Sequence, residues 1–228
     1  MTAVDAFTPL RPDTDPYRLG HGHEAAGLHA HDASGHGEGG PASKRVIVGY
    51  GFWIFLLSDI ILFSAFFAAY AVLWTATDGG PTGRDLFDPT SVAVETACLL
   101  LSSFTCGMSA VATGARSQLW TQVFLVATGL LGAAFLAFEA KDFAGMVAQG
   151  AAPQRSAFLS SFFAVVGCHG IHVTTGLLWL GTMMAQVWVK GFRPNILRRL
   201  LCFNLFWHVL DIIWIALFTI VYLIGMGR

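Results

Sequence analysis

The stretch FNLFWHVLDIIWIALFTIVYLIG, residues 203–225, is apolar enough to lie in a membrane. It is also long enough, because a helix needs about 20 residues to cross a hydrocarbon core of about 30 Å. Three polar residues interrupt it, at Asn204, His208 and Asp211. Ionisable side chains are costly in hydrocarbon and usually face a bundle interior or a water-filled cavity. The stretch therefore predicts a membrane helix with one polar face that is turned towards neighbouring helices.

The composition of the whole chain indicates an integral membrane protein. Hydrophobic residues make up 55% of the 228 residues, the mean hydropathy is +0.62, and only 12% of the residues are charged. A soluble domain would carry about a quarter charged residues. The net charge of −1 gives no indication of nucleic-acid binding.

Residues 1–43 are polar, rich in Gly, Asp and His, and lack the apolar segment of a secretory signal. We expect a disordered cytoplasmic tail. Its histidines are His21, His23, His29, His31 and His36. Such a tract can bind divalent metals weakly. A solvated tail is the simpler interpretation, because no fixed scaffold would impose ligand geometry.

Five long apolar runs follow the tail, and they predict an all-α transmembrane domain over residues 44–228. The expected spans are residues 48–75, 91–114, 119–146, 157–189 and 199–226. All eight prolines lie outside these spans, which suits uninterrupted helices. Because the connections are short, consecutive helices should pack as antiparallel neighbours. The four cysteines lie within the runs without forming a CxxC pair, and we interpret them as packing residues.

The basic residues predict the orientation of the bundle. Alternate flanks of the spans hold seven basic residues against three, setting aside Lys141 at a span edge. The richer side includes Lys44 and Arg45 before the first span and four basic residues between the fourth and fifth spans. Because basic flanks stay in the cytoplasm, we expect the N-terminus inside and the C-terminus in the periplasm.

Eight polar residues embedded in the spans are the candidate site residues: Asp59, Glu95, Glu139, His169, His172, Asn204, His208 and Asp211. At a rise of 1.5 Å per residue, the histidines and aspartates fall near the midplane, and the two glutamates lie towards the outer side. Asn204, His208 and Asp211 are spaced by four and three residues, so they share one helix face. The two histidines of the fourth span also share a face.

These residues permit several functions. A haem site would need opposed imidazoles, whereas two of the three embedded histidines are close together on one helix. A di-metal carboxylate site would need Glu-x-x-His pairs on facing helices, and none is present. A proton relay through Asp59, His172, His208 and Asp211 is physically permitted. We favour a structural network without catalytic, cofactor or metal residues. In this network Asp211 should pair with a polar group on a neighbouring helix, and a histidine of the fourth span is the favoured partner.

Four stretches carry motifs that are specific in combination: GFWIFLLSDIILFSAFFAAYAV (51–72), FLAFEAKDF (135–143), AFLSSFFAVVGCHGIHVTTGLLW (157–179) and FWHVLDIIWIALFTIVYLIG (206–225). The third contains FF-x-x-x-G-x-HG-x-HV-x-x-G and the fourth WH-x-x-D-x-x-W. Together they resemble subunit III of the haem-copper respiratory oxidases over residues 44–228. Within that family, the resemblance is to the cytochrome o ubiquinol oxidase branch, which has five spans and often a His-rich tail.

The resemblance implies a role in a terminal oxidase that oxidises ubiquinol, reduces oxygen to water and translocates protons during aerobic respiration. In this family subunit III carries no redox centre, and haem and copper lie in subunit I. The resemblance therefore implies an accessory subunit of the bacterial cytoplasmic membrane, with subunits I, II and IV and membrane lipids as partners. It also implies bound phospholipid, stabilisation of subunit I and support of sustained proton uptake.

One family hallmark differs in this chain. The acid of the S-D/E-x-x-x-F motif is Asp59, where cytochrome c oxidases usually carry glutamate. Aspartate is one methylene shorter, so a relay role inferred from the glutamate branch does not transfer directly. From the residues alone, a small proton-coupled membrane transporter is the alternative function.

Overall fold

Long helices account for nearly all of the described chain. The computed structural model describes residues 44–223 and 225, so the predicted tail lies outside the described residues. Five helices are long and apolar enough to cross a membrane, which confirms the predicted all-α membrane bundle. They are α1 (Lys44–Leu73), α3 (Pro89–Gly114), α4 (Gln118–Ala148), α5 (Ala157–Lys190) and α6 (Pro194–Leu217). The short α2 (Gly83–Leu86) and η1 (Pro153–Arg155) lie in connections, and a π-helix, η2 (Phe218–Leu223), continues α6.

Local capping interactions explain several of the helix ends. Asp88 precedes α3, and its carboxylate accepts a hydrogen bond of 3.0 Å from the backbone N–H of Thr90. Ser156 caps α5 in the same way by accepting from the N–H of Leu159 at 3.2 Å. At its other end α5 stops at Gly191, whose φ of 63° lies in the left-handed region that favours glycine.

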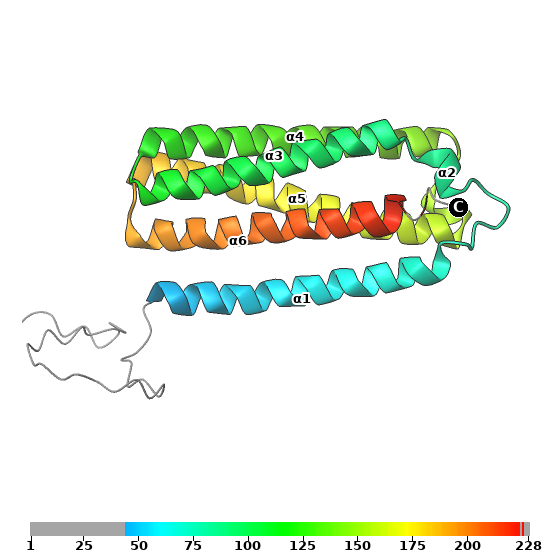
Figure 1. The fold of residues 1–228 in the computed structure, drawn as a ribbon, viewed down its shortest axis with the longest axis horizontal. Helices are drawn as coiled ribbons and strands as arrows, with labels where there is room; N and C mark the ends of the chain where they lie inside the picture. Colours follow the sequence, from blue (N-terminus) through cyan, green and yellow to red (C-terminus); the bar gives the residue numbers. More distant parts are fainter. Residues whose placement is uncertain (1–43, 224, 226–228) are drawn as a thin grey trace, which may run out of the picture.

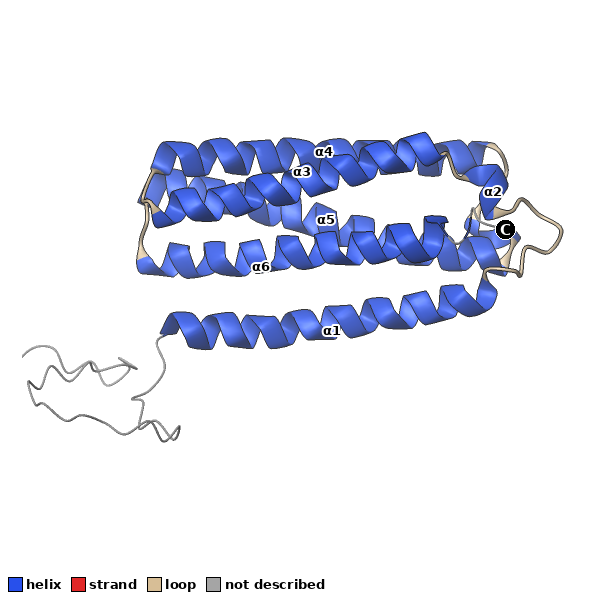
Figure 2. Cartoon of the chain, viewed as in Figure 1, coloured by secondary structure: helices blue, strands red, loops and turns tan. Residues whose placement is uncertain are grey.

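Helix α6 occupies the middle of the bundle and packs on α1, α3 and α5. Figure 1 shows α1 along one side of α6, with α3 and α4 on the opposite side. The α3–α4 and α5–α6 connections lie at one end of the bundle, and the α1–α3 and α4–α5 connections lie at the other (Figure 2). Among the five long helices, α6 buries the largest share of its apolar segment and α1 the smallest.

The expected packing of consecutive helices is confirmed for α3 on α4, α4 on α5 and α5 on α6. It is wrong for the first two spans, because α1 packs mainly on α5 and α6. The connection between α1 and α3 is the longest in the domain, and it contains α2. A long connection does not hold its two helices side by side, so α1 can attach to the far side of α6.

Close approach of α4, α5 and α6 depends on two glycines. The indole of Trp207 on α6 is fully buried between Gly132 of α4 and Gly176 of α5. A Cβ at Gly132 would lie 2.9 Å from Trp207 Cζ2, and one at Gly176 would lie 2.9 Å from Trp207 Cζ3. Small residues let membrane helices approach closely, and here they create the space for the largest side chain in the core.

Candidate functional site

Four hydrogen bonds connect α3 with α6 along the bundle, and we call them the α3–α6 seam. They join Trp214 Nε1 to Thr96 Oγ1 (3.1 Å), Trp207 Nε1 to Ser102 Oγ (2.8 Å), His208 Nδ1 to Ser103 Oγ (2.8 Å) and Cys106 Sγ to Asn204 Oδ1 (3.3 Å). As their spacing predicted, Asn204 and His208 face the same neighbouring helix. Hydrogen bonds between helices stabilise bundles in membranes, so the seam fixes the register of α3 against α6.

The seam allows buried polar groups to be satisfied in an apolar core. A buried indole N–H needs an acceptor. Ser102 supplies it for Trp207, and Thr96 supplies it for Trp214, seven residues further along the same helix. Both hydroxyls sit on α3, so the two large aromatic side chains of α6 are held by the same neighbour.

Replacing Ser102 with alanine should lower the free energy of unfolding by about 1 kcal/mol, because the Trp207 N–H loses its acceptor in a site from which water is excluded. Thermal unfolding of the purified chain in detergent measures this change. Ser64→Ala is the matched control, since the exposed Ser64 hydroxyl donates only to the Ile60 carbonyl of its own helix. An equal effect of both substitutions would contradict a specific contribution of the seam.

Asp211 extends the seam, but with different partners from those predicted. The residue is 8% exposed, and its carboxyl interacts with the Ser103 hydroxyl and with the His208 ring. Its Oδ1 atom is buried without a hydrogen-bond partner in the described part of the chain. Ser103 is a polar group on a neighbouring helix, as the broader prediction expected, but the favoured partner, a histidine of the fourth span, is wrong. The polar face of α6 turns towards α3, and no hydrogen bond joins Asp211 to either histidine of α5 among the described residues.

His169 of α5 is surrounded by aromatic side chains. Its ring lies 5.3 Å from that of Trp214, 5.9 Å from that of Phe135 and 6.2 Å from that of Phe63. Neither ring nitrogen has a hydrogen-bond partner within the described residues, and the side chain is completely buried. This enclosure leaves no open position at which His169 could bind a haem iron.

His172 and Asp59 lie between α5 and α1. Nδ1 of His172 donates to the Cys168 carbonyl of its own helix at 2.8 Å, and the ring contacts that of Phe63 at 5.2 Å. Asp59 of α1 is half-buried and interacts electrostatically with the Cys168 thiol. Both residues thus interact with Cys168 at the α1–α5 contact, separately from the seam.

The two glutamates of the candidate site form a second cluster. Glu95 of α3 is 1% exposed and Glu139 of α4 is 5% exposed, and both line a small cavity with Asp142 and Tyr222. Glu95 Oε1 and both carboxyl oxygens of Glu139 have no hydrogen-bond partner among the described residues. A Cβ at Gly170 would lie 3.2 Å from Glu139 Oε1, so this glycine leaves room for the carboxyl group.

Sequence reasoning missed several members of both groups. Asp142 lines the cavity beside Glu95 and Glu139 and accepts a hydrogen bond of 2.7 Å from Ser91. It follows Glu139 by three residues, and this helical spacing could have indicated that they share a face. The seam serines on α3 gave a weaker signal, because serine hydroxyls in helices often bond to their own backbone. In the described residues no three His, Cys, Asp or Glu side chains gather as metal ligands.

Comparison with known proteins identifies the family of this bundle. The family model described as cytochrome c oxidase subunit III matches residues 30–226. The chain belongs to the cytochrome c oxidase subunit III family. Relatives in this family align over most of their length. Cytochrome bo(3) ubiquinol oxidase subunit 3 of Pseudomonas aeruginosa is 46% identical over 213 residues, which cover 92% of this chain and 94% of the relative.

Further members of the subunit III family support the same assignment. The Pseudomonas putida protein of the same name is 48% identical over 77% of this chain and 85% of its own length. Quinol oxidase subunit 3 of Bacillus subtilis is 41% identical over 78% of this chain and 87% of its own length. Membership of this family, together with the five apolar helices, makes the chain a multi-pass bacterial membrane protein and favours an oxidase subunit over a transporter.

Proposed function

We propose that this chain is the accessory subunit III of a haem-copper ubiquinol oxidase and that it stabilises catalytic subunit I without carrying a redox centre. The 46% identity to a ubiquinol oxidase subunit 3 over nearly the whole chain is the observation that carries the proposal. The bundle itself supports it, because the embedded imidazoles serve internal contacts: His208 bonds to Ser103, His172 bonds to its own backbone, and His169 is enclosed. Haem and copper belong to subunit I in this proposal.

Purification through an affinity tag on this chain tests the proposal. A gentle detergent extract should yield a complex of this chain with the haem-bearing subunit I and with subunits II and IV, and the complex should have ubiquinol oxidase activity. The chain expressed alone should give no Soret band at stoichiometric intensity and should oxidise no quinol. A complex without haem, or stoichiometric haem in the isolated chain, would overturn the proposal.

The proposed orientation places the N-terminus in the cytoplasm. The end of the bundle with the α3–α4 and α5–α6 connections also holds most of the basic residues, among them Arg116, Lys190 and Arg193. Periplasmic reporter fusions after residues 85 and 155 should be active, and a fusion after residue 194 should be inactive. The reverse pattern would mean that the basic end faces the periplasm.

We also propose that phospholipid binds at the basic end of the bundle. A cavity of about 360 Å³ lies between α1, α5 and α6, with Phe52 and Trp179 among its apolar walls and Arg198 and Arg199 at its polar side. Two guanidinium groups beside an apolar wall suit a lipid phosphate with its acyl chains. Mass spectrometry of the purified complex should detect bound lipid. Substituting both arginines, Arg198→Gln and Arg199→Gln, should remove this lipid.

A further inference from the structure

Helix α6 turns a single narrow stripe away from the bundle core. Between residues 200 and 215, the side chains that are not buried are Leu201, Leu205, His208, Ile212 and Ile215. They recur at intervals of four and three residues, which places them on one helix face that we call the outward stripe of α6. His208 is in the middle of this stripe and also in the middle of the membrane span Pro194–Leu223. A hydrogen-bonding ring thus lies at the bundle surface at mid-membrane depth.

The hydrogen bonds of His208 within the described residues involve only one of its two ring nitrogens. The Ser103 hydroxyl lies 2.8 Å from Nδ1 of His208 and also interacts with the Asp211 carboxyl. Each nitrogen of an imidazole ring can donate or accept, according to the tautomer. Nε2 of His208 has no hydrogen-bond partner in the described residues, so it presents an unused hydrogen-bonding position to whatever covers the stripe.

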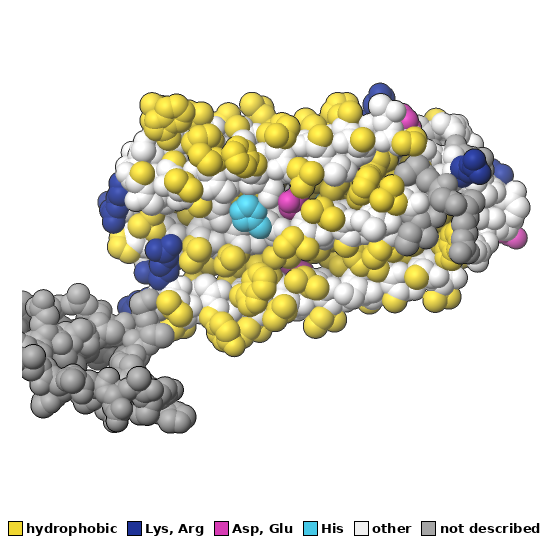
Figure 3. All heavy atoms as spheres, in the orientation of Figure 1, with side chains coloured by type: hydrophobic (Ala, Val, Ile, Leu, Met, Phe, Trp, Pro, Cys, Tyr) yellow, Lys and Arg dark blue, Asp and Glu magenta, His cyan; other side chains and the backbone are white. Residues whose placement is uncertain are grey.

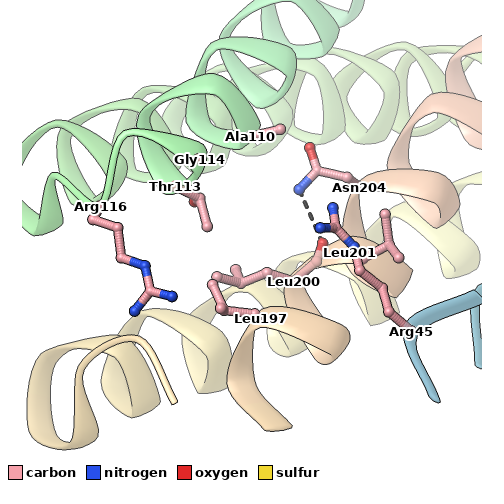
Figure 4. Close-up of a pocket in the computed structure, with 9 residues that line it drawn as sticks. All are labelled: Arg45, Ala110, Thr113, Gly114, Arg116, Leu197, Leu200, Leu201 and Asn204. Atoms are coloured by element: carbon pink, nitrogen blue, oxygen red, sulfur yellow. Dashed lines mark hydrogen bonds between the residues drawn. The ribbon is translucent and has the colours of Figure 1, made fainter. Parts of the chain in front are cut away.

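A groove beside the stripe provides space for a neighbouring helix. The cavity between α3 and α6 has a volume of about 230 Å³, and its walls include small residues of α3. Figure 4 shows Ala110 and Gly114 on α3 and Asn204 on α6 facing this space, with Arg45 and Arg116 at its two sides. Small residues of this kind allow close helix packing in membranes.

His208 lies one turn beyond Asn204, which lines this groove, and its ring faces Gly107 of α3. A Cβ at Gly107 would lie 4.0 Å from His208 Cε1, so α3 approaches the ring closely on this side. Figure 3 shows histidine and acidic surface on this face of the bundle, surrounded by hydrophobic side chains. Lipid tails offer no hydrogen-bond donor, so lipid would leave these groups unsatisfied.

We propose that the α3–α6 groove and the outward stripe of α6 seat a transmembrane helix of another oxidase subunit, whose hydroxyl or amide side chain forms a hydrogen bond with His208 Nε2. The proposal rests on the function proposed above, because it needs an assembled oxidase. Within that complex it specifies the face of contact and the chemistry of the opposing residue. The apolar Ile212 and Ile215 pack against the same helix.

Photocrosslinking in the assembled oxidase tests the face of contact. p-Benzoylphenylalanine replaces Ile212, which is 61% exposed on the stripe, or Ile171, which is 68% exposed on α5 and serves as the matched control. We expect Ile212 to give a covalent adduct with another oxidase subunit, and Ile171 to give lipid adducts. Mass spectrometry should locate the adduct on a helix with a hydroxyl or amide side chain close by. Lipid adducts alone at Ile212 would overturn the proposal.

Substitution of His208 tests the hydrogen bond. His208→Leu should weaken retention of this chain in the detergent-solubilised complex by about three- to tenfold, the effect of one interhelical hydrogen bond. Ser103→Ala is the control, because it removes the bond inside the seam and leaves Nε2 in place. Equal retention of His208→Leu and the unaltered chain would overturn the proposal, as would equal loss in both variants. If the complex still contains haem in either outcome, the proposed function remains supported although the proposed contact is wrong.

Discussion

Replacing Gly176 with alanine should lower the free energy of unfolding of the chain by about 1–3 kcal/mol, the range for overpacking a close-packed core. The new Cβ would lie 2.9 Å from Trp207 Cζ3 and 3.1 Å from Phe206 Cε1. Both neighbours are rigid rings on α6, and Trp207 is held by its bond to Ser102. The clash can therefore be relieved only by moving α5 away from α6. Thermal unfolding of the purified chain in detergent measures the loss.

Gly181→Ala provides the matched control on the same helix. A Cβ at Gly181 would meet nothing within 4 Å, so the substitution should be neutral or slightly stabilising because alanine favours the helix. In the assembled oxidase, Gly176→Ala should also reduce the amount of the chain that remains bound to its partners. If Gly176→Ala were as stable as Gly181→Ala, the contact between α5 and Trp207 would not be a constraint on the bundle.

Apolar length was sufficient to predict the five membrane helices, because each run exceeds the thickness of a bilayer and proline is excluded from it. Helical spacing was sufficient to place Asn204 and His208 on one face. Neither observation says which helix that face meets. Short connections suggested α5 as the partner of the polar face of α6, whereas the structure places α3 there, more than 90 residues away in sequence. Contacts of this kind depend on the three-dimensional order of the helices, which hydropathy does not encode.

For a related reason, the sequence did not reveal which side chains of α3 form hydrogen bonds with α6. Ser102 and Ser103 have hydroxyls that could bond to their own helix, so they do not look costly in a membrane. The acids and imidazoles stand out in the sequence because their burial in a membrane is costly. They were therefore expected to pair with one another. His169 shows where this reasoning fails, since its ring packs among aromatic side chains and neither nitrogen has a partner in the described residues.

Replacing Asp59 with alanine should shorten the active lifetime of the assembled oxidase several-fold during sustained turnover and change its initial rate little. Helix α1 is the least buried of the five and packs mainly on α5 and α6. Asp59 lies at this contact, near the Cys168 thiol, while Phe63 packs its ring against His172. Loss of the side chain should loosen α1 and, in the proposed oxidase, the contact of this chain with subunit I. Quinol oxidation followed from the first turnovers to inactivation measures both quantities.

Asp59→Asn distinguishes this structural role from a proton relay. Asparagine keeps the size and hydrogen-bonding capacity of the side chain, so under the structural hypothesis its lifetime and proton translocation should stay close to those of the unaltered oxidase. Asparagine cannot release and regain a proton as a carboxyl group does, so a relay through Asp59 would fail equally in both variants. A large and equal loss of initial proton uptake with alanine and asparagine would therefore show that Asp59 carries protons. Because α1 is the helix with the fewest internal contacts, it is also the helix whose attachment one side chain can affect most.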